Sequence, residues 1–209
     1  MNKETASARM MSSLLLGYPD DVLIDRLPQL HRVVAELPEP TRAPLSEFLA
    51  YLESTPLLEA QQHFVTTFDM KRKACPYLTY WTDGDTRNRG RAILHFKQAY
   101  LEAGFTMTDE EMADHLAVVL EFSSVCSPEL GDVLLLEHAG PIGLLAQALH
   151  TMDSPYAHVL DAVVATLPPA TPALREAMAR LAASGPPAEQ VGLEPFGVTS
   201  LPDPMGARR

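Results

Sequence analysis

The sequence is poor in cysteine and in basic residues. Only Cys75 and Cys126 are present, with no CxxC pair and no companion histidines at zinc-finger spacing, so neither a disulfide framework nor a structural zinc site is indicated. There are 16 lysines and arginines against 27 aspartates and glutamates, which gives a formal charge of −11. A field of this sign repels nucleic acid and anionic membrane surfaces. The composition therefore argues against nucleic-acid binding.

Long apolar runs and catalytic signatures are also missing. No window approaches the roughly 18–20 apolar residues that span a bilayer, and residues 1–8 lack the basic-then-apolar order of a signal peptide. We therefore expect a cytoplasmic protein with no direct membrane insertion. The sequence contains no GxGxxG, GxxxxGK[ST], GxSxG or HExxH motif. We accordingly predict no catalytic residue, no metal ligand and no enzymatic activity.

Helical periodicity is what the sequence does contain. Hydrophobic residues make up 46% of its 209 positions, enough for a sizeable core. They recur at steps of three and four, as in Leu23, Leu27, Leu30, Val34 and Leu37, between segments rich in proline and glycine. Because an amphipathic helix can bury its apolar stripe only against a neighbour, this pattern favours a bundle. We predict an all-α, single-domain bundle of roughly nine helices over residues 1–184.

Three helix boundaries matter for the argument that follows. Thr41 can cap a helix that begins after two prolines. A long helix is expected from Asp85 or Thr86 to about Ala103. Another is expected to begin at Asp109 with three acidic residues and to continue to about position 122. That helix would carry Asp114 and His115 in its body.

Residues 185–209 differ in composition from the rest of the chain. They contain five prolines and four glycines, and they show no helical period. Such a composition is typical of a flexible tail. The sequence leaves two roles open for this C-terminal tail, which is either dispensable or folds over a groove and competes with a partner.

The segment from Lys71 to Arg91 is unlike its surroundings. It holds six basic residues and two acidic ones, a local charge of +4, and it leaves −15 for the remainder of the chain. Its rings Tyr77, Tyr80 and Trp81 are of the amphipathic kind that favours binding surfaces. Its arginines could pair with carboxylates or phosphates. Neutralisation of the protein's own helix ends, and core packing of Tyr80 and Trp81, are the structural alternatives.

The pair Asp114 and His115 is a second candidate. If the segment is helical, Glu111 lies one turn before His115 on the same face, where it could tune a general base or help hold a metal. A single histidine is more commonly a structural residue with one satisfied hydrogen bond. Two alternatives remain open: a small helical metal- or phosphate-dependent hydrolase using Asp114 and His115, or a helical regulator that binds an anion.

Three stretches carry a resemblance to a known family. They are residues 64–72 (FVTTFDMKR), 77–90 (YLTYWTDGDTRNRG) and 112–116 (MADHL), supported by 14–19 (LLLGYP) near the start. Together they resemble the NarJ-type nitrate reductase molybdenum cofactor assembly chaperones, within the wider TorD and DmsD family of redox-enzyme maturation chaperones. The resemblance covers roughly residues 8–180.

The resemblance implies a cytoplasmic chaperone that is not an enzyme. Such chaperones bind the apo catalytic (alpha) subunit of a membrane-bound respiratory nitrate reductase, partly through its N-terminal segment, until bis-molybdopterin guanine dinucleotide is inserted. It implies no permanently bound cofactor and leaves open a transient contact with the cofactor of the client. The residues that we predict to bind the partner are Tyr77, Leu78, Tyr80, Trp81, Asp83, Asp85, Arg87, Arg89, Arg91, Asp114 and His115.

Overall fold

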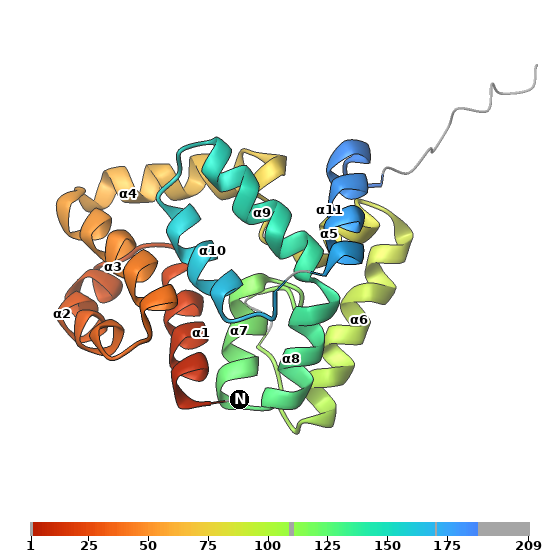
Figure 1. Cartoon of the computed structure of the whole chain (residues 1–209), viewed down its shortest axis with the longest axis horizontal. Coiled ribbons are helices and arrows are strands. Elements are labelled where there is room, and N and C mark those ends of the chain that lie inside the picture. The colour runs from red at the N-terminus through yellow and green to blue at the C-terminus, as the bar shows by residue number, and fades with distance from the viewer. Residues whose placement is uncertain (1, 109–110, 170, 188–209) are drawn as a thin grey trace, which may run out of the picture.

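A computed structural model describes residues 2–108, 111–169 and 171–187, and helices dominate this part of the chain (Figure 1). The eleven α-helices are α1 (Lys3–Leu15), α2 (Asp21–Ala35), α3 (Glu39–Ser54), α4 (Leu57–Phe64), α5 (Leu78–Asp83), α6 (Arg87–Glu102), α7 (Leu116–Val125), α8 (Pro128–Glu137), α9 (Ala139–Thr151), α10 (Tyr156–Ala165) and α11 (Pro172–Ser184). A π-helical turn (Val65–Asp69) and a 3-10 turn (Arg72–Ala74) follow α4. The predicted all-α fold is confirmed.

The helix count exceeds the prediction for two local reasons. Helix α5 lies in the basic segment, ahead of the long helix predicted from Asp85 or Thr86. The run after Pro128 divides into α8 and α9 at His138, because its backbone leaves the helical region there. No helix in the described part combines the length and the hydrophobicity needed to cross a bilayer.

The centre of the molecule is built from α1, α3, α7 and α10. Helix α1 packs on α7 and α10, and α10 packs in turn on α3 (Figure 1). Side chains such as Leu15, Phe48, Leu120 and Leu160 are completely buried between these helices. The core also holds one buried cation, Arg9, whose guanidinium lies 2.5 Å from the carboxylate of Asp132 on α8. An apolar core with a neutralised charge therefore fixes the body of the bundle.

An aromatic cluster joins the two ends of this body. The ring of Tyr156 at the start of α10 lies 4.8 Å from both Phe48 and Phe68 and is stacked on the imidazole of His63. Nε2 of that histidine is 2.9 Å from the Ser154 hydroxyl. Burial lowers the pKa of His63, so its neutral form is the one that packs here.

One predicted helix start is wrong. Helix α3 begins at Glu39, with Pro38 rather than Thr41 at the N-cap. The Thr41 hydroxyl instead donates to the carbonyl of Pro38 at 3.0 Å. Because a proline suits the first helical turn, Pro40 allows the helix to begin before the threonine.

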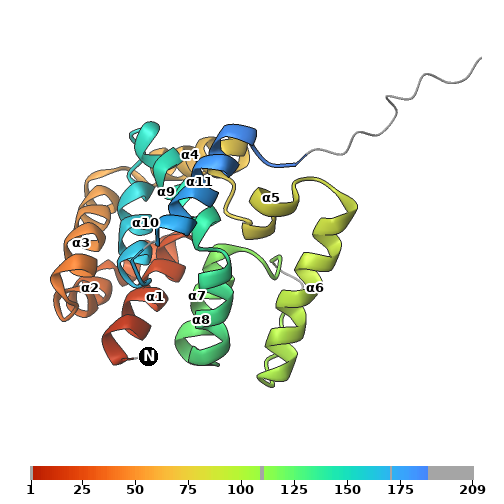
Figure 2. The ribbon, with the colours of Figure 1, turned by 45° about the vertical axis from the view of Figure 1, so that its right-hand side comes forward.

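The periphery consists of α5, α6 and α11. Helix α6 stands at one side of the molecule, and α11 lies over α9 (Figure 2). No side chain of α11 is fully buried. The helix rests on Gly143, where an added Cβ would come within 2.3 Å of Met178 Cε.

The chain beyond α11 lies against a second glycine, Gly84. At Gly84 an added Cβ would lie 1.6 Å from the carbonyl oxygen of Pro187, and φ is +60°, which favours glycine. Residues 185–187 therefore lie against the turn between α5 and α6. The remainder of the predicted tail, 188–209, is outside the described residues.

Candidate partner-binding site

The candidate residues meet at an isolated antiparallel bridge between Tyr77 and His115. The backbone N–H of Leu78 donates to the carbonyl of Asp114, and that of Leu116 donates to the carbonyl of Pro76, both at 3.0 Å. These two bonds bring together segments 38 positions apart in the sequence. The bridge therefore places the basic segment directly beside the Asp114 pair.

The bridge also corrects the helix that we predicted from Asp109. Residues 109 and 110 lie outside the described part, and the segment 111–115 is not helical. Helix α7 begins at Leu116, and His115 is its N-cap, with Nδ1 accepting a hydrogen bond from the N–H of Ala117 at 3.2 Å. Because the backbone at 114 and 116 pairs with residues 76 and 78, it cannot complete a helical turn.

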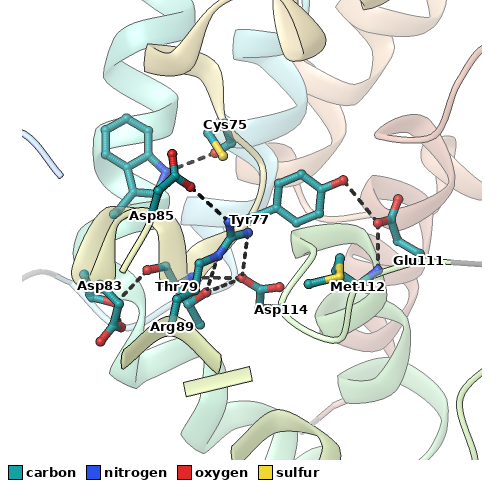
Figure 3. Close-up of polar contacts among 11 residues, drawn as sticks. Cys75, Tyr77, Thr79, Asp83, Asp85, Arg89, Glu111, Met112 and Asp114 are labelled. Atoms are coloured by element: carbon teal, nitrogen blue, oxygen red, sulfur yellow. Dashed lines mark hydrogen bonds and ion pairs between the residues drawn. The ribbon is translucent and has the colours of Figure 1, made fainter. Parts of the chain in front are cut away.

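Asp114 is fully buried and organises the polar contacts of the site (Figure 3). Its Oδ2 accepts from the Thr79 hydroxyl at 2.5 Å and from the Thr79 backbone N–H at 3.2 Å. The Arg89 guanidinium lies 3.9 Å from the same oxygen. The other carboxylate oxygen, Oδ1, is buried without a hydrogen-bond partner. The carboxylate thus ties α5, α6 and the start of α7 together.

Arg89 and Tyr77 form the outer layer above this carboxylate. Arg89 donates from Nε to Thr79 Oγ1 at 3.3 Å, and its guanidinium carbon is 5.6 Å from the centre of the Tyr77 ring, a cation–π distance. The Tyr77 hydroxyl donates to Glu111 at 3.2 Å. Burial, followed by the charge of Glu111, raises the pKa of Tyr77 to about 12. Tyr77 therefore stays protonated and keeps its donor at neutral pH.

His115 packs edge-on against the Tyr77 ring, with ring centres 5.1 Å apart. Burial lowers the pKa of this histidine, although Glu111 and Asp114 act in the opposite direction. The expected pairing of Glu111 and His115 on one helix face is replaced by contacts that both make with Tyr77.

Three predicted contact residues are buried. Leu78 is completely inaccessible, and Tyr80 and Trp81 expose less than a tenth of their surface. The Trp81 indole N–H donates to the carbonyl of Cys75 at 3.0 Å. These side chains are inaccessible because α5 packs against α9. In this conformation they hold α5 in place, and their part in partner binding stays a prediction.

The charged residues of the turn and of early α6 are more accessible. Asp83 is half-buried, whereas Asp85, Arg87 and Arg91 are exposed. Thr86, not Asp85, caps α6 by accepting from the N–H of Asn88 at 3.3 Å. The carboxylate of Asp85 instead lies 3.5 Å from Arg89.

Beside this cluster is a pocket of about 430 Å³ between α6 and the segment that follows it. It is lined mainly by apolar side chains, and among the described residues its charged members are Lys97 and Glu111. The apolar members are Ile93, Tyr100, Leu101, Phe105, Met107 and Met112. Because Glu111 also binds Tyr77, the pocket and the polar cluster share an edge.

A comparison with known proteins assigns the chain to a family. The sequence model of a family described as "Nitrate reductase delta subunit" matches residues 34–162, which is more than half of the chain. The chain belongs to the nitrate reductase delta subunit family. The matched range includes both segments of the bridge and the pocket.

Relatives within this family include named assembly chaperones. The chain is 31% identical over 158 residues to the probable nitrate reductase molybdenum cofactor assembly chaperone NarJ of Bacillus subtilis, a match covering 74% of this chain and 85% of the relative. It is 30% identical over 153 residues to NarJ of Escherichia coli K12, covering 71% of this chain and 64% of that protein. The resemblance to NarJ-type chaperones is confirmed.

A third relative is larger. The chain is 39% identical over 155 residues to the nitrate reductase-like protein NarX of Mycobacterium tuberculosis H37Rv. That match covers 74% of this chain and 23% of NarX. The chain therefore spans less than a quarter of this relative's length.

The polar groups of Asp114 and His115 are engaged within the chain. Oδ2 of Asp114 is committed to Thr79 and Arg89, and Nδ1 of His115 to Ala117. No group of three potential metal ligands occurs among the described residues. What the site presents to solvent is an apolar pocket with charged residues at its edge, the usual form of a peptide-binding groove.

Sequence reasoning missed Thr79, Glu111 as the partner of Tyr77, and the pocket. A single threonine between apolar residues carries no pattern. The cluster Phe105, Met107 and Met112 was the available signal for the pocket, since it places apolar residues outside a long helix.

Proposed function

We propose that the protein is a dedicated, non-enzymatic chaperone of respiratory nitrate reductase. In this role it binds the apo catalytic subunit in the cytoplasm, including the N-terminal segment, and supports molybdenum cofactor insertion. Membership of the delta subunit family and similarity to proteins named NarJ support the proposal. The observation that carries it is the apolar pocket edged by Lys97 and Glu111 beside the Tyr77–His115 bridge.

The pocket suits one face of an amphipathic helix. Apolar side chains of a client peptide would enter between Ile93, Leu101 and Met112, and its polar side chains would meet the charged edge. Lys97 and Glu111 have opposite charges, so they favour one direction of the peptide over the other. Further client contacts would come from residues outside the pocket, namely Tyr77, the turn residues Asp83 and Asp85, and Arg87, Arg89 and Arg91 at the start of α6.

The buried members of the predicted partner-binding set would contribute by holding the surrounding helices in position. Leu78, Tyr80 and Trp81 hold α5 in place, while Asp114 and His115 hold the start of α7 against it. Substitutions of these residues would change client binding by moving the charged edge of the pocket. A direct contact with bis-molybdopterin guanine dinucleotide would involve the exposed arginines Arg87 and Arg91, whose guanidinium groups suit phosphate oxygens.

The pocket is tested by isothermal titration of the full chain with a synthetic peptide of the N-terminal segment of the client catalytic subunit. Leu101→Asp places a charge at a side chain that is 61% exposed and lines the pocket. We expect at least about tenfold weaker binding, which corresponds to about 1.4 kcal/mol. Leu58→Asp is the matched control on α4, because Leu58 is 65% exposed and is not among the pocket residues. Equal affinity for both variants would remove the pocket from the client site.

The cellular function is tested in a strain that lacks the protein. We expect the nitrate reductase catalytic subunit to accumulate without molybdenum, and its activity to return when the full chain is supplied. Molybdenum content of the purified subunit is the measurement. A fully loaded subunit in the deletion strain would contradict the proposed function.

A further inference from the structure

Two glycine contacts fix where the described part of the chain ends. Met178 of α11 is seated over Gly143, and the backbone of Pro187 is seated on Gly84. Gly84 lies just before α6, and the pocket is formed by the second half of α6. The described chain therefore ends beside the turn before α6, and the pocket lies farther along that helix.

The length of the remaining segment is sufficient. From Arg87 to Lys97 the helix rises about 15 Å, at roughly 1.5 Å per residue. An extended chain covers about 3.3 Å per residue, so the nine residues 188–196 can span up to about 30 Å. Leu193 and Phe196 are thus within reach of the pocket.

The composition of this segment matches the pocket. Leu193 and Phe196 are large apolar residues within an otherwise proline- and glycine-rich stretch, and Glu194 lies between them. The pocket offers apolar walls and the cation of Lys97. Pro195 restricts the backbone before binding, which lowers the entropy lost on ordering.

We propose that residues 188–209 bind back along α6 and place Leu193 and Phe196 in the pocket when no client is present. The docking itself does not depend on the proposed function, whereas its consequence, competition with the client peptide, rests on it. An attached segment acts at a high effective concentration. If it fills the pocket in about nine of ten molecules, the apparent client affinity falls about tenfold.

The docking is tested without any client. Amide chemical shifts of the pocket residues are compared between the full chain and its Leu193→Ser/Phe196→Ser variant. The matched control, Val198→Ser/Leu201→Ser, makes the same kind of change further along the same segment. We expect Ile93, Leu101 and Met107 to shift in the first variant and to stay in place in the control. Unshifted pocket amides in the first variant, or equal shifts in both, would overturn the assignment.

A second copy of the chain is the competing occupant. The same spectra recorded at low and high protein concentration distinguish the two arrangements. We expect the pocket shifts to be independent of concentration, because the segment belongs to the same molecule. Shifts that grow with concentration would overturn the intramolecular docking.

Competition is tested by titrating the client peptide into the full chain and into Leu193→Ser/Phe196→Ser. We expect several-fold tighter binding by the variant. Pocket shifts accompanied by unchanged client affinity would overturn the competition. If neither chain binds the peptide, the proposed client interaction fails, while the spectra still decide the docking.

Discussion

The body of α1, α3, α7 and α10 and the periphery of α5, α6 and α11 are held by different interactions. Completely buried apolar side chains join the body, among them Leu15, Phe48 and Leu160. The attachment of α5 and α6 combines buried apolar side chains, among them Leu78 and Phe96, with the polar contacts of Asp114, and α11 rests on a glycine. Each buried apolar side chain contributes about 1.5–3 kcal/mol, whereas a hydrogen bond contributes a net of about 0.5–1.5 kcal/mol. Helix α11, which has no fully buried side chain, can therefore open at a lower free energy than the body.

The largest expected effect is in the body. Phe48→Ala removes a completely buried ring that packs against Tyr156, and we expect a loss of about 3–5 kcal/mol in the free energy of unfolding. Urea denaturation followed by circular dichroism measures it. Leu58→Ala, at an exposed position, should stay within about 0.5 kcal/mol of the parent chain. A small effect of Phe48→Ala would contradict the division into body and periphery.

Asp114→Ala should give an intermediate effect confined to the periphery. It leaves Thr79 and Arg89 without their buried acceptor, at an expected cost of about 1–3 kcal/mol. Hydrogen exchange should accelerate in α5 and α6 more than in α10. Asp85→Ala is the control, because Asp85 also pairs with Arg89 but is exposed, and it should cost less than about 1 kcal/mol. Uniform acceleration across all helices would argue against a separate polar attachment.

Gly143→Ala tests the attachment of α11 separately from that of α5 and α6. The new methyl group would meet Met178, so we expect faster hydrogen exchange in α11 with little change in α10. Gly90→Ala is the control within α6, because nothing lies within 4 Å of an added Cβ there, and it should stabilise the helix by about 0.5–1 kcal/mol. Unchanged exchange in α11 would show that Met178 moves aside.

The positive charge at the start of α6 should have a smaller effect, on binding alone. Arg91→Glu reverses an exposed charge on α6, and we expect client-peptide affinity to change by about twofold to fivefold, less at high salt. Arg32→Glu makes the same charge change on α2. If the two variants change the affinity equally, only the net charge of the protein matters.

Acid should destabilise the fold slightly. Burial lowers the pKa of His63 on α4, of His115 at the start of α7 and of His138 between α8 and α9. Because the unfolded chain binds protons more readily, stability is complete above about pH 6.5 and is lost as the pH falls below it. His63→Gln should flatten this dependence in denaturant titrations between about pH 7.5 and 5. An unchanged slope would assign the acid sensitivity to the other histidines.

The helices also differ in how far the sequence predicted them. Local spacing was enough for α2, with its repeated leucines, and for α6, which begins within two residues of the expected start. It failed at α7, because the start of that helix is set by a backbone bridge to Tyr77, 38 positions earlier. Residue type alone could not tell that Tyr80 and Trp81 are buried, since large amphipathic rings occur in cores and at interfaces alike. The contacts of Asp114 were missed for the same reason as α7: they are long-range.

The bridge at Tyr77 and His115 has a practical consequence for protein engineering. The Leu78 nitrogen and the Asp114 oxygen are 3.0 Å apart, so the segment between them begins and ends at the same place on the molecule. An excursion closed at its base can be transplanted between homologues as a cassette, if the host supplies the two ends and the surfaces of α7 and α9 on which the cassette packs. Chimeras that swap residues 80–112 would show whether client choice travels with the cassette or stays with the scaffold.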